Sequence, residues 1–258
     1  MSLEQSNVNQ GNFLFKYRGQ LPIILFLFSI PFIKYSASYE TTYYFVLFSI
    51  LFTVFGYLMR FYTVATTPKN TSGRNTNKQI AETLNKTGSY SLVRNPLYLA
   101  NYFIWSGISL FTFNIYFMIL MSIFFYLIYS KIIKAEELFL KSKFGKEYEI
   151  WANTVSSFLP KKINFIKSSI PFSAVSILRR EYPSVLSGLI GFIFIDILRN
   201  YFENQSFFLS RSITYIAFIL IFIVLILRTL KHHTNLLNEK DRSEILKSSI
   251  KNKLKYYL

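Results

Sequence analysis

The sequence predicts an all-α fold, a polytopic membrane helical bundle of about six transmembrane helices with both termini on the cytoplasmic side. Hydrophobic residues make up 52% of the 258 residues and aromatic residues 19%, which is more than the core of a soluble domain requires. Several apolar runs approach or reach the roughly 20 residues that a helix needs to cross a bilayer. Basic residues gather between these runs, which is typical of a multi-pass membrane protein.

The six apolar runs define the expected spans, at residues 21–35, 42–62, 96–113, 115–133, 184–198 and 212–230. The first, third and fifth runs are short or contain proline or glycine, so their ends are the least defined. Lys16, Arg18 and the run 21–33 also fit a signal peptide, although Pro31 and Lys34 argue against cleavage.

The basic residues indicate the orientation of the bundle. We find 26 of the 29 basic residues on one predicted side, and only Lys34, Arg199 and Arg211 on the other. Lysine and arginine in short loops favour the cytoplasmic side. We therefore expect the functional face to lie toward the cytoplasm. We favour a bacterial cytoplasmic membrane over the endoplasmic reticulum.

The net charge of +16 also bears on possible partners. Because the cations lie between apolar spans, anionic lipid headgroups explain them better than nucleic acid does, and we expect no nucleic-acid partner. The chain has no cysteine, which excludes disulfides, thiolate nucleophiles and sulfur-ligated metals. We expect no metal site, and the sequence leaves the oligomeric state open.

A first polar cluster precedes the third predicted span and contains Arg94, Asn95 and Pro96. Asparagine is a favoured helix N-cap and proline a favoured first helical residue, so the span is expected to begin here. A helix start beside a guanidinium attracts an anion. The alternative is that Arg94 only anchors the helix end among lipid phosphates.

A second polar cluster, which contains Glu136 and Glu137, follows the fourth predicted span. A short turn at Phe113 and Asn114 makes the third and fourth spans a hairpin, so these glutamates should return to the face that carries Arg94. Adjacent helical residues point about 100° apart, so at most one of the two carboxylates should face a given ligand atom.

These motifs together resemble the isoprenylcysteine carboxyl methyltransferase and phospholipid methyltransferase superfamily. The resemblance covers roughly residues 45–160 and rests on the string 87–98, the hairpin, the paired glutamates, the string 144–148 and the string 155–160. It implies an integral-membrane enzyme that takes S-adenosylmethionine from the cytoplasm and methylates a lipid or lipid-anchored acceptor.

The resemblance also implies site residues. Arg94, Asn95 and Tyr98 match the family's Arg-His-Pro-x-Tyr cofactor motif, with asparagine in place of histidine, and Glu136 and Glu137 match its paired glutamates. We expect Arg94 and the helix start to hold the cofactor carboxylate, and Glu136 or Glu137 to hold its ribose or amino group. An aromatic ring should face the sulfonium by a cation-π contact, and the candidates are Tyr90, Tyr98 and Tyr102. Arg94 and Glu137 are the predicted catalytic residues.

The missing imidazole favours one kind of acceptor. A carboxylate or phosphate oxygen is already a nucleophile at neutral pH, whereas an ammonium group must first lose a proton. We therefore favour O-methylation of an isoprenylcysteine-like carboxylate or of a lipid A-like phosphate. N-methylation of a phospholipid stays open, because Glu137 could act as a base. Arg74, in loop 71–76, is either a further phosphate contact or an orientation signal.

The chain divides into a predicted methyltransferase core, 1–162, and an additional hairpin with a basic tail, 163–258. In the hairpin, Asp196 is expected to pair with Arg199 three residues later. His232 and His233 are expected in a cationic tail at the membrane surface. Two further classes remain as alternatives, namely an NADPH-dependent membrane sterol-type reductase and a non-enzymatic channel or transporter.

Overall fold

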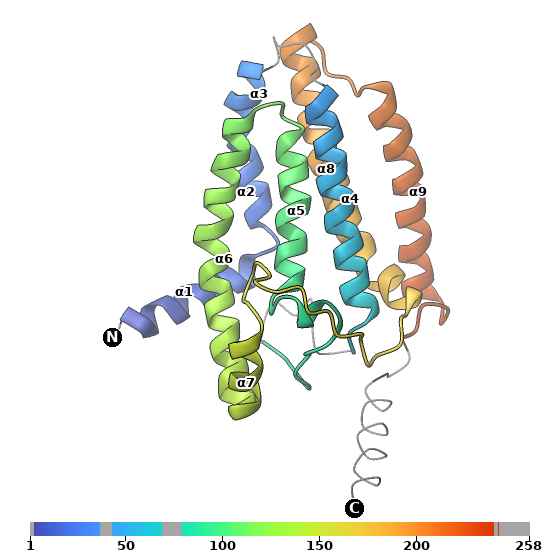
Figure 1. Ribbon diagram of the computed structural model, residues 1–258. Coiled ribbons are helices and arrows are strands. Elements are labelled where there is room, and N and C mark those ends of the chain that lie inside the picture. Colours follow the sequence, from blue (N-terminus) through green and yellow to red (C-terminus); the bar gives the residue numbers. More distant parts are fainter. Residues whose placement is uncertain (1–2, 37–42, 69–78, 240–241, 243–258) are drawn as a thin grey trace, which may run out of the picture.

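The computed structural model describes residues 3–36, 43–68, 79–239 and 242, and the side chains from residue 9 onward. All regular secondary structure in these ranges is helical (Figure 1), which confirms the all-α prediction. The helices are α1 (Leu3–Tyr17), α2 (Leu21–Leu27), α3 (Ile30–Ser36), α4 (Tyr43–Ala65), the 3-10 helix η1 (Gly88–Ser91), α5 (Pro96–Leu110), α6 (Ile115–Phe144), α7 (Lys146–Thr154), α8 (Ala174–Asn204) and α9 (Arg211–His233).

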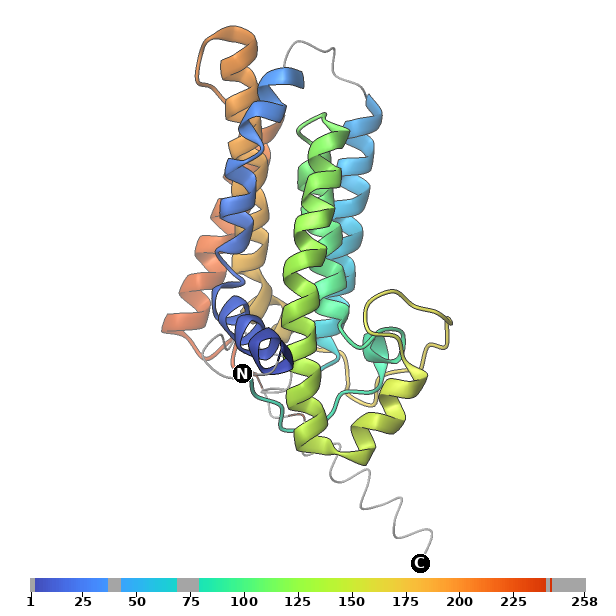
Figure 2. The ribbon, with the colours of Figure 1, turned by 90° about the vertical axis from the view of Figure 1, so that its left-hand side faces the viewer.

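Four of the described helices are long and apolar enough to cross a membrane, namely α4, α6, α8 and α9. The predicted first span is divided into α2 and α3, of 7 residues each, and the third is α5, of only 15 residues. Pro31 lacks a backbone N–H and restricts the residue before it, which accounts for the break before α3. The count of about six spans is therefore not confirmed, although α2, α3 and α5 run beside the long helices (Figures 1 and 2).

The α4–α5 contact is built on small residues. A Cβ atom on Gly107 would lie 2.1 Å from Thr53 Oγ1, and one on Gly56 would lie 2.8 Å from the Ala100 carbonyl oxygen. Ser49 Oγ donates to the Gly107 carbonyl at 2.7 Å. Small residues let two helix backbones approach closely inside a membrane, so these positions fix the distance between α4 and the helix that begins at the first polar cluster.

The predicted hairpin is present between α5 and α6. Asn114 caps α6, because its side chain accepts hydrogen bonds from the backbone N–H groups of Tyr116 and Phe117. Helix α6 continues to Phe144, well beyond the predicted end of the span at residue 133. Gly145, with φ 52°, then allows the sharp reversal into α7. The second polar cluster therefore lies on a helix rather than on a loop.

Helix α8 is tied to the core by buried polar contacts. The guanidinium of Arg60, on α4, pairs with Glu181 and donates to Asn101 Oδ1, on α5, at 2.6 Å. Tyr57 Oη donates to the Ser184 carbonyl at 3.0 Å. The segment beyond residue 162 therefore packs against the helices that form the predicted core.

The predicted pair of Asp196 and Arg199 is wrong. Asp196 accepts instead from the backbone N–H of Ser210, at 2.7 Å, and from the hydroxyl of the same residue. Arg199 pairs with Glu203 at 2.9 Å. The reason is that α8 continues to Asn204, which places Glu203 one helical turn from Arg199, and that the next loop returns Ser210 to Asp196.

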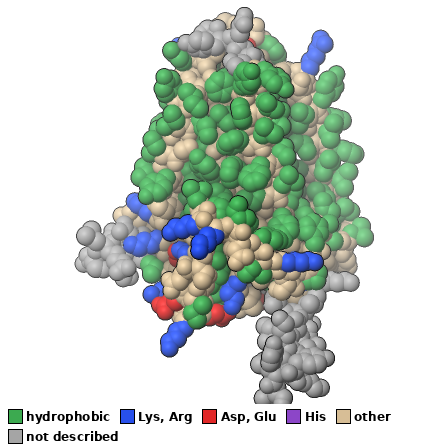
Figure 3. All heavy atoms as spheres, viewed as in Figure 1, with side chains coloured by type: hydrophobic (Ala, Val, Ile, Leu, Met, Phe, Trp, Pro, Cys, Tyr) green, Lys and Arg blue, Asp and Glu red, His purple; other side chains and the backbone are tan. Residues whose placement is uncertain are grey.

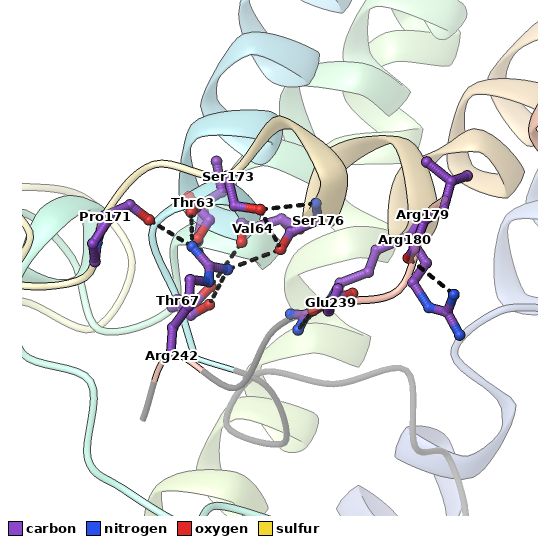
Figure 4. Close-up of polar contacts among 12 residues, drawn as sticks. Thr63, Val64, Thr67, Pro171, Ser173, Ser176, Arg179, Arg180, Glu239 and Arg242 are labelled. Atoms are coloured by element: carbon purple, nitrogen blue, oxygen red, sulfur yellow. Dashed lines mark hydrogen bonds and ion pairs between the residues drawn. The ribbon is translucent and has the colours of Figure 1, made fainter. Parts of the chain in front are cut away.

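The described end of the chain is held by Arg242 (Figure 4). Its guanidinium donates to the carbonyl oxygens of Ala65, Pro171 and Thr67 at 2.5, 2.6 and 3.0 Å, and to Ser176 Oγ at 2.9 Å. Burial, followed by the nearby charge of Arg180, lowers the pKa of Arg242. The predicted surface tail beyond residue 242 and loop 71–76 with Arg74 lie outside the described residues.

Charge is distributed unevenly over the surface. Figure 3 shows apolar side chains along the long helices and basic and acidic side chains near the end that carries α7. His232 and His233 are exposed in the last turn of α9. Helix α1 lies across this same end of the bundle (Figure 2). An apolar belt beside a charged end is the arrangement expected of a helix bundle in a bilayer.

Candidate functional site

Arg94 and Glu137 meet at the charged end of the bundle. Arg94 Nε lies 3.0 Å from Glu137 Oε1, and Arg94 Nη2 lies 2.9 Å from Glu137 Oε2. This is the bidentate geometry that a guanidinium and a carboxylate favour. The return of the second cluster to Arg94 is therefore confirmed, and it follows from the α5–α6 hairpin.

The segment after α7 closes around Arg94. Arg94 Nη1 donates to the carbonyl oxygens of Ala152 and Val155 at 2.8 and 2.6 Å. The backbone N–H groups of Arg94 and Asn95 donate to the carbonyls of Ser156 and Ser157 at 2.8 and 3.1 Å. The guanidinium is thus held by two separate segments of the chain.

The Asn95 side chain contacts Glu137 rather than the helix that it precedes. Helix α5 begins at Pro96 as expected, but the Asn95 side chain makes no capping hydrogen bond to it. Asn95 Nδ2 donates instead to Glu137 Oε1 at 3.0 Å and to the Ser157 carbonyl at 3.1 Å. An amide here supplies the donor that the family's histidine ring would supply.

Glu137 therefore collects hydrogen bonds from three side chains. Its Oε1 atom accepts from Arg94 and Asn95, and also from Ser157 Oγ at 2.7 Å. The carboxylate is a fixed anchor at the centre of the cluster.

Two neighbouring groups have shifted pKa values. Burial lowers the pKa of Arg94, but the hydrogen bonds and charge of Glu137 outweigh it and leave the pKa above its ordinary value. Burial and then the charge of Glu137 raise the pKa of Tyr148, on α7. Arg94 is therefore charged and Tyr148 neutral throughout the physiological pH range.

Glu136 points away from Arg94. Its nearest cation is Arg18, with 4.0 Å between Nη1 and Oε1. Tyr98 is buried on the same side, and its ring meets that of Tyr129 edge-on at 5.0 Å between centroids. The two glutamates diverge as adjacent helical residues must, so Glu136 and Tyr98 form a second group beside the first.

The remaining predicted tyrosines, Tyr102 and Tyr90, lie in different elements. Tyr102 Oη lies 3.0 Å from Ser122 Oγ, and both residues line a cavity that also reaches Arg94 and Glu137. Tyr90 lies in η1. Of the predicted site residues, the structure brings Arg94, Tyr102 and Glu137 to the wall of one cavity, while Asn95 supports Glu137 beside it.

The cavity that begins at Arg94 and Glu137 has a volume of about 1460 Å³. One face of α6 forms its long wall and contributes Ser122, Tyr126, Ser130, Lys134, Glu137 and Lys141. These residues recur about every helical turn, and Ser122 and Glu137, 15 positions apart in the sequence, are separated by about 22 Å along the helix. The cavity is charged at one end and aromatic at the other.

Sequence reasoning missed several members of this site. Ser157, Tyr148 and the carbonyls of Ala152 and Val155 were not among the predicted site residues. The signal was present, because strings 144–148 and 155–160 belong to the resemblance. Their spacing, however, does not reveal which backbone atoms face Arg94.

Comparison with known proteins gives one family match. Residues 43–147 match the family model described as phospholipid methyltransferase. Searches of curated proteins and of solved structures found no match. The family match includes Arg94 and both glutamates and confirms the predicted recognition of the methyltransferase superfamily. The segment with Ser157 and the helices α8 and α9 lie outside the matched range.

Proposed function

We propose that this chain is an integral-membrane, S-adenosylmethionine-dependent methyltransferase that O-methylates a lipid or lipid-anchored acceptor. The family match supports a membrane methyltransferase that acts on lipid. The observation that carries the proposal is the bidentate pair of Arg94 and Glu137, which both lie in the matched range and both line one large cavity.

The chemistry of the cavity fits S-adenosylmethionine. This cofactor carries a carboxylate, ribose hydroxyls and a sulfonium, and when bound it supplies an electrophilic methyl group. Arg94 offers a fixed guanidinium, Glu137 a carboxylate, and Tyr102, Phe125 and Tyr126 electron-rich rings. We assign Arg94 to the carboxylate, Glu137 to the ribose or amino group and Tyr102 to the sulfonium.

The second group of predicted residues, Glu136 and Tyr98, is not among the residues that line the cavity. Glu136 and Tyr98 lie toward Arg18 and Tyr129, and Tyr129 itself lines the cavity. We propose that they support this wall and that Asn95 fixes the carboxylate of Glu137. Because methyl transfer needs alignment and exclusion of water, such supporting contacts bear directly on rate.

The acceptor would enter from the bilayer. Tyr126 and Leu159 line the cavity and are 71% and 66% exposed, so the cavity has apolar side chains at its open surface. An acyl or prenyl chain could therefore lie along α6 with its polar end near Glu137. We place the protein in a bacterial cytoplasmic membrane with this end toward the cytoplasm, because most of its basic residues lie there.

O-methylation is favoured over N-methylation because Glu137, the carboxylate among the described residues that line the cavity, already accepts three side-chain hydrogen bonds. These donors hold its oxygens toward the chain itself, so it is poorly placed to take a proton from an ammonium headgroup. A carboxylate or phosphate acceptor needs no base. N-methylation of a phospholipid is the second candidate, favoured by the description of the matched family.

Ligand-induced stabilisation tests the class of enzyme. A ligand that binds only the folded protein raises its unfolding temperature. We expect S-adenosylmethionine to stabilise the purified protein and NADPH to have no effect. Stabilisation by NADPH alone would support the reductase, and stabilisation by neither would support a non-enzymatic protein.

Labelled methyl transfer tests the kind of acceptor. The purified protein is incubated with methyl-labelled S-adenosylmethionine and total lipid extract, and the labelled lipid is then hydrolysed with base. Carboxylate methyl esters release labelled methanol, whereas methyl phosphate diesters and methylated amines keep the label. Label that survives base is therefore followed through complete acid hydrolysis, and its recovery in an N-methylated headgroup amine would overturn O-methylation in favour of N-methylation.

A further inference from the structure

The charged end of the cavity has a strong excess of positive charge. Its lining contains five cations, Arg94, Lys134, Lys141, Lys161 and Lys162, but only one carboxylate, Glu137. The charges of Arg94 and Glu137 balance each other at 2.9 Å. The net charge at this end of the cavity is therefore determined by the lysines.

Among the described residues, one of the four lysines has a partner of opposite charge and three have none. Lys141 pairs with Glu149 at 3.0 Å. Lys134, Lys161 and Lys162 form no ion pair with any carboxylate in the part of the chain that the structure describes. They come from two walls, because Lys134 lies on α6, one turn before Glu137, and the other two follow α7.

This arrangement is matched to an anion with an apolar tail. The lysines face the same cavity whose other end is lined by Tyr102, Phe125 and Tyr126. A cofactor with a single carboxylate already has Arg94 as its partner. Three further cations call for a second anionic group, and basic pockets beside membrane helices bind anionic lipid headgroups.

We propose that Lys134, Lys161 and Lys162 form the headgroup site of the acceptor, and that the acceptor is a lipid with an anionic headgroup. The proposal rests on the proposed function, because it places the headgroup in the cavity assigned to methyl transfer. The lysines hold the headgroup beside Glu137, and the chain lies along α6 toward Ser122.

The test compares two triple variants of equal charge. K134Q/K161Q/K162Q removes the cavity lysines, and K143Q/K146Q/K167Q removes three exposed lysines that do not line the cavity. Each purified full-length protein is titrated with dioleoyl phosphatidic acid in neutral detergent micelles while its unfolding temperature is followed. Dioleoyl phosphatidylcholine serves as the zwitterionic lipid, and inorganic phosphate tests whether the anion alone is sufficient.

We expect phosphatidic acid to stabilise the wild type and the control variant equally, and phosphatidylcholine or inorganic phosphate to do much less. The cavity variant should need at least about tenfold more phosphatidic acid for half-maximal stabilisation, since each lysine near a lipid surface contributes about a fivefold gain in affinity. Equal responses of the two triple variants, or equal stabilisation of the wild type by the two lipids, would overturn the proposal.

Two further measurements keep the result interpretable. K134R/K161R/K162R keeps the charges and should respond like the wild type, and its failure to do so would exclude a charge-based headgroup site. Stabilisation by S-adenosylmethionine is followed in parallel. Its loss in every protein, the wild type included, would mean that the proposed function fails. If S-adenosylmethionine still stabilises the proteins while the two triple variants respond equally to phosphatidic acid, only the headgroup site fails.

Discussion

Glu137 determines how the site is arranged at the scale of single residues. Its carboxylate joins Arg94, which precedes α5, to Ser157, which follows α7. Asn95 donates to the same oxygen that Ser157 does. Each charged hydrogen bond contributes about 1.5–3 kcal/mol. Substitutions at these positions should therefore weaken both cofactor binding and activity.

Substitution of Asn95 tests the role of its amide. Asn95→Ala removes the donor to Glu137 and Ser157 and should lower methyl transfer about thirtyfold, because two hydrogen bonds at about 1 kcal/mol each are lost. Asn95→His keeps a ring donor and should retain more activity than Asn95→Ala. Asn95→Asp places a second negative charge beside Glu137 and should be the least active. Wild-type activity in Asn95→Asp would show that the amide does not support the site.

Tyr148 gives a pH-dependent contribution to stability. Burial and the charge of Glu137 raise its pKa in the folded protein, while the unfolded chain loses this proton near about pH 10. Above that pH the folded state binds more protons than the unfolded state, so stability falls as pH rises. Tyr148→Phe should show a smaller fall between about pH 9 and 11 in thermal unfolding. If the unfolding temperatures of the wild type and Tyr148→Phe fall equally with pH, the raised pKa of Tyr148 is contradicted.

At the scale of elements, the α5–α6 hairpin could be predicted and the contacts that complete the site could not. The apolar runs and the Phe113–Asn114 turn indicate two antiparallel helices, which is sufficient to bring Glu137 back to Arg94. The pairing of Ser157 with Asn95 depends on how the chain returns after Gly145. Nothing local in the sequence encodes such a long-range contact, and the same is true of the pair Arg60 and Glu181.

The buried pair of Arg60 and Glu181 should hold α8 against α4. The two side chains are 15% and 3% exposed. Removing one partner leaves an unpaired buried charge, which costs about 3–5 kcal/mol, whereas replacing both by apolar residues of similar volume costs much less. We expect Glu181→Leu to lower the unfolding temperature strongly and Arg60→Met/Glu181→Leu to restore most of it. A double variant as unstable as the single one would show that the charges are not coupled.

At the scale of the whole molecule, the charged end and the α8–α9 loop are expected to face opposite sides of the membrane. Figure 1 shows these two regions at opposite ends of the bundle. The sequence predicts this polarity from the positions of the basic residues. Pro31 explains the break between α2 and α3, but the sequence alone does not predict it, because a proline can either kink a helix or end it.

The natural absence of cysteine allows a direct test of this topology. Asn164→Cys places one thiol at the charged end, and Phe207→Cys places one in the α8–α9 loop, where Phe207 is 71% exposed. A membrane-impermeant maleimide should label only Phe207→Cys in intact cells and only Asn164→Cys in inverted vesicles. Labelling of both from the same side would contradict the predicted orientation.

The central claim is that the Arg94–Glu137 cavity performs methyl transfer to lipid. It is tested most directly by transfer of labelled methyl groups from S-adenosylmethionine into total lipid by the wild type, Glu137→Gln and the exposed control Glu149→Gln. We predict that Glu149→Gln keeps wild-type activity and that Glu137→Gln loses at least about tenfold, because Arg94 loses its counter-charge. Full activity in Glu137→Gln, or no lipid labelling by the wild type, would contradict the account.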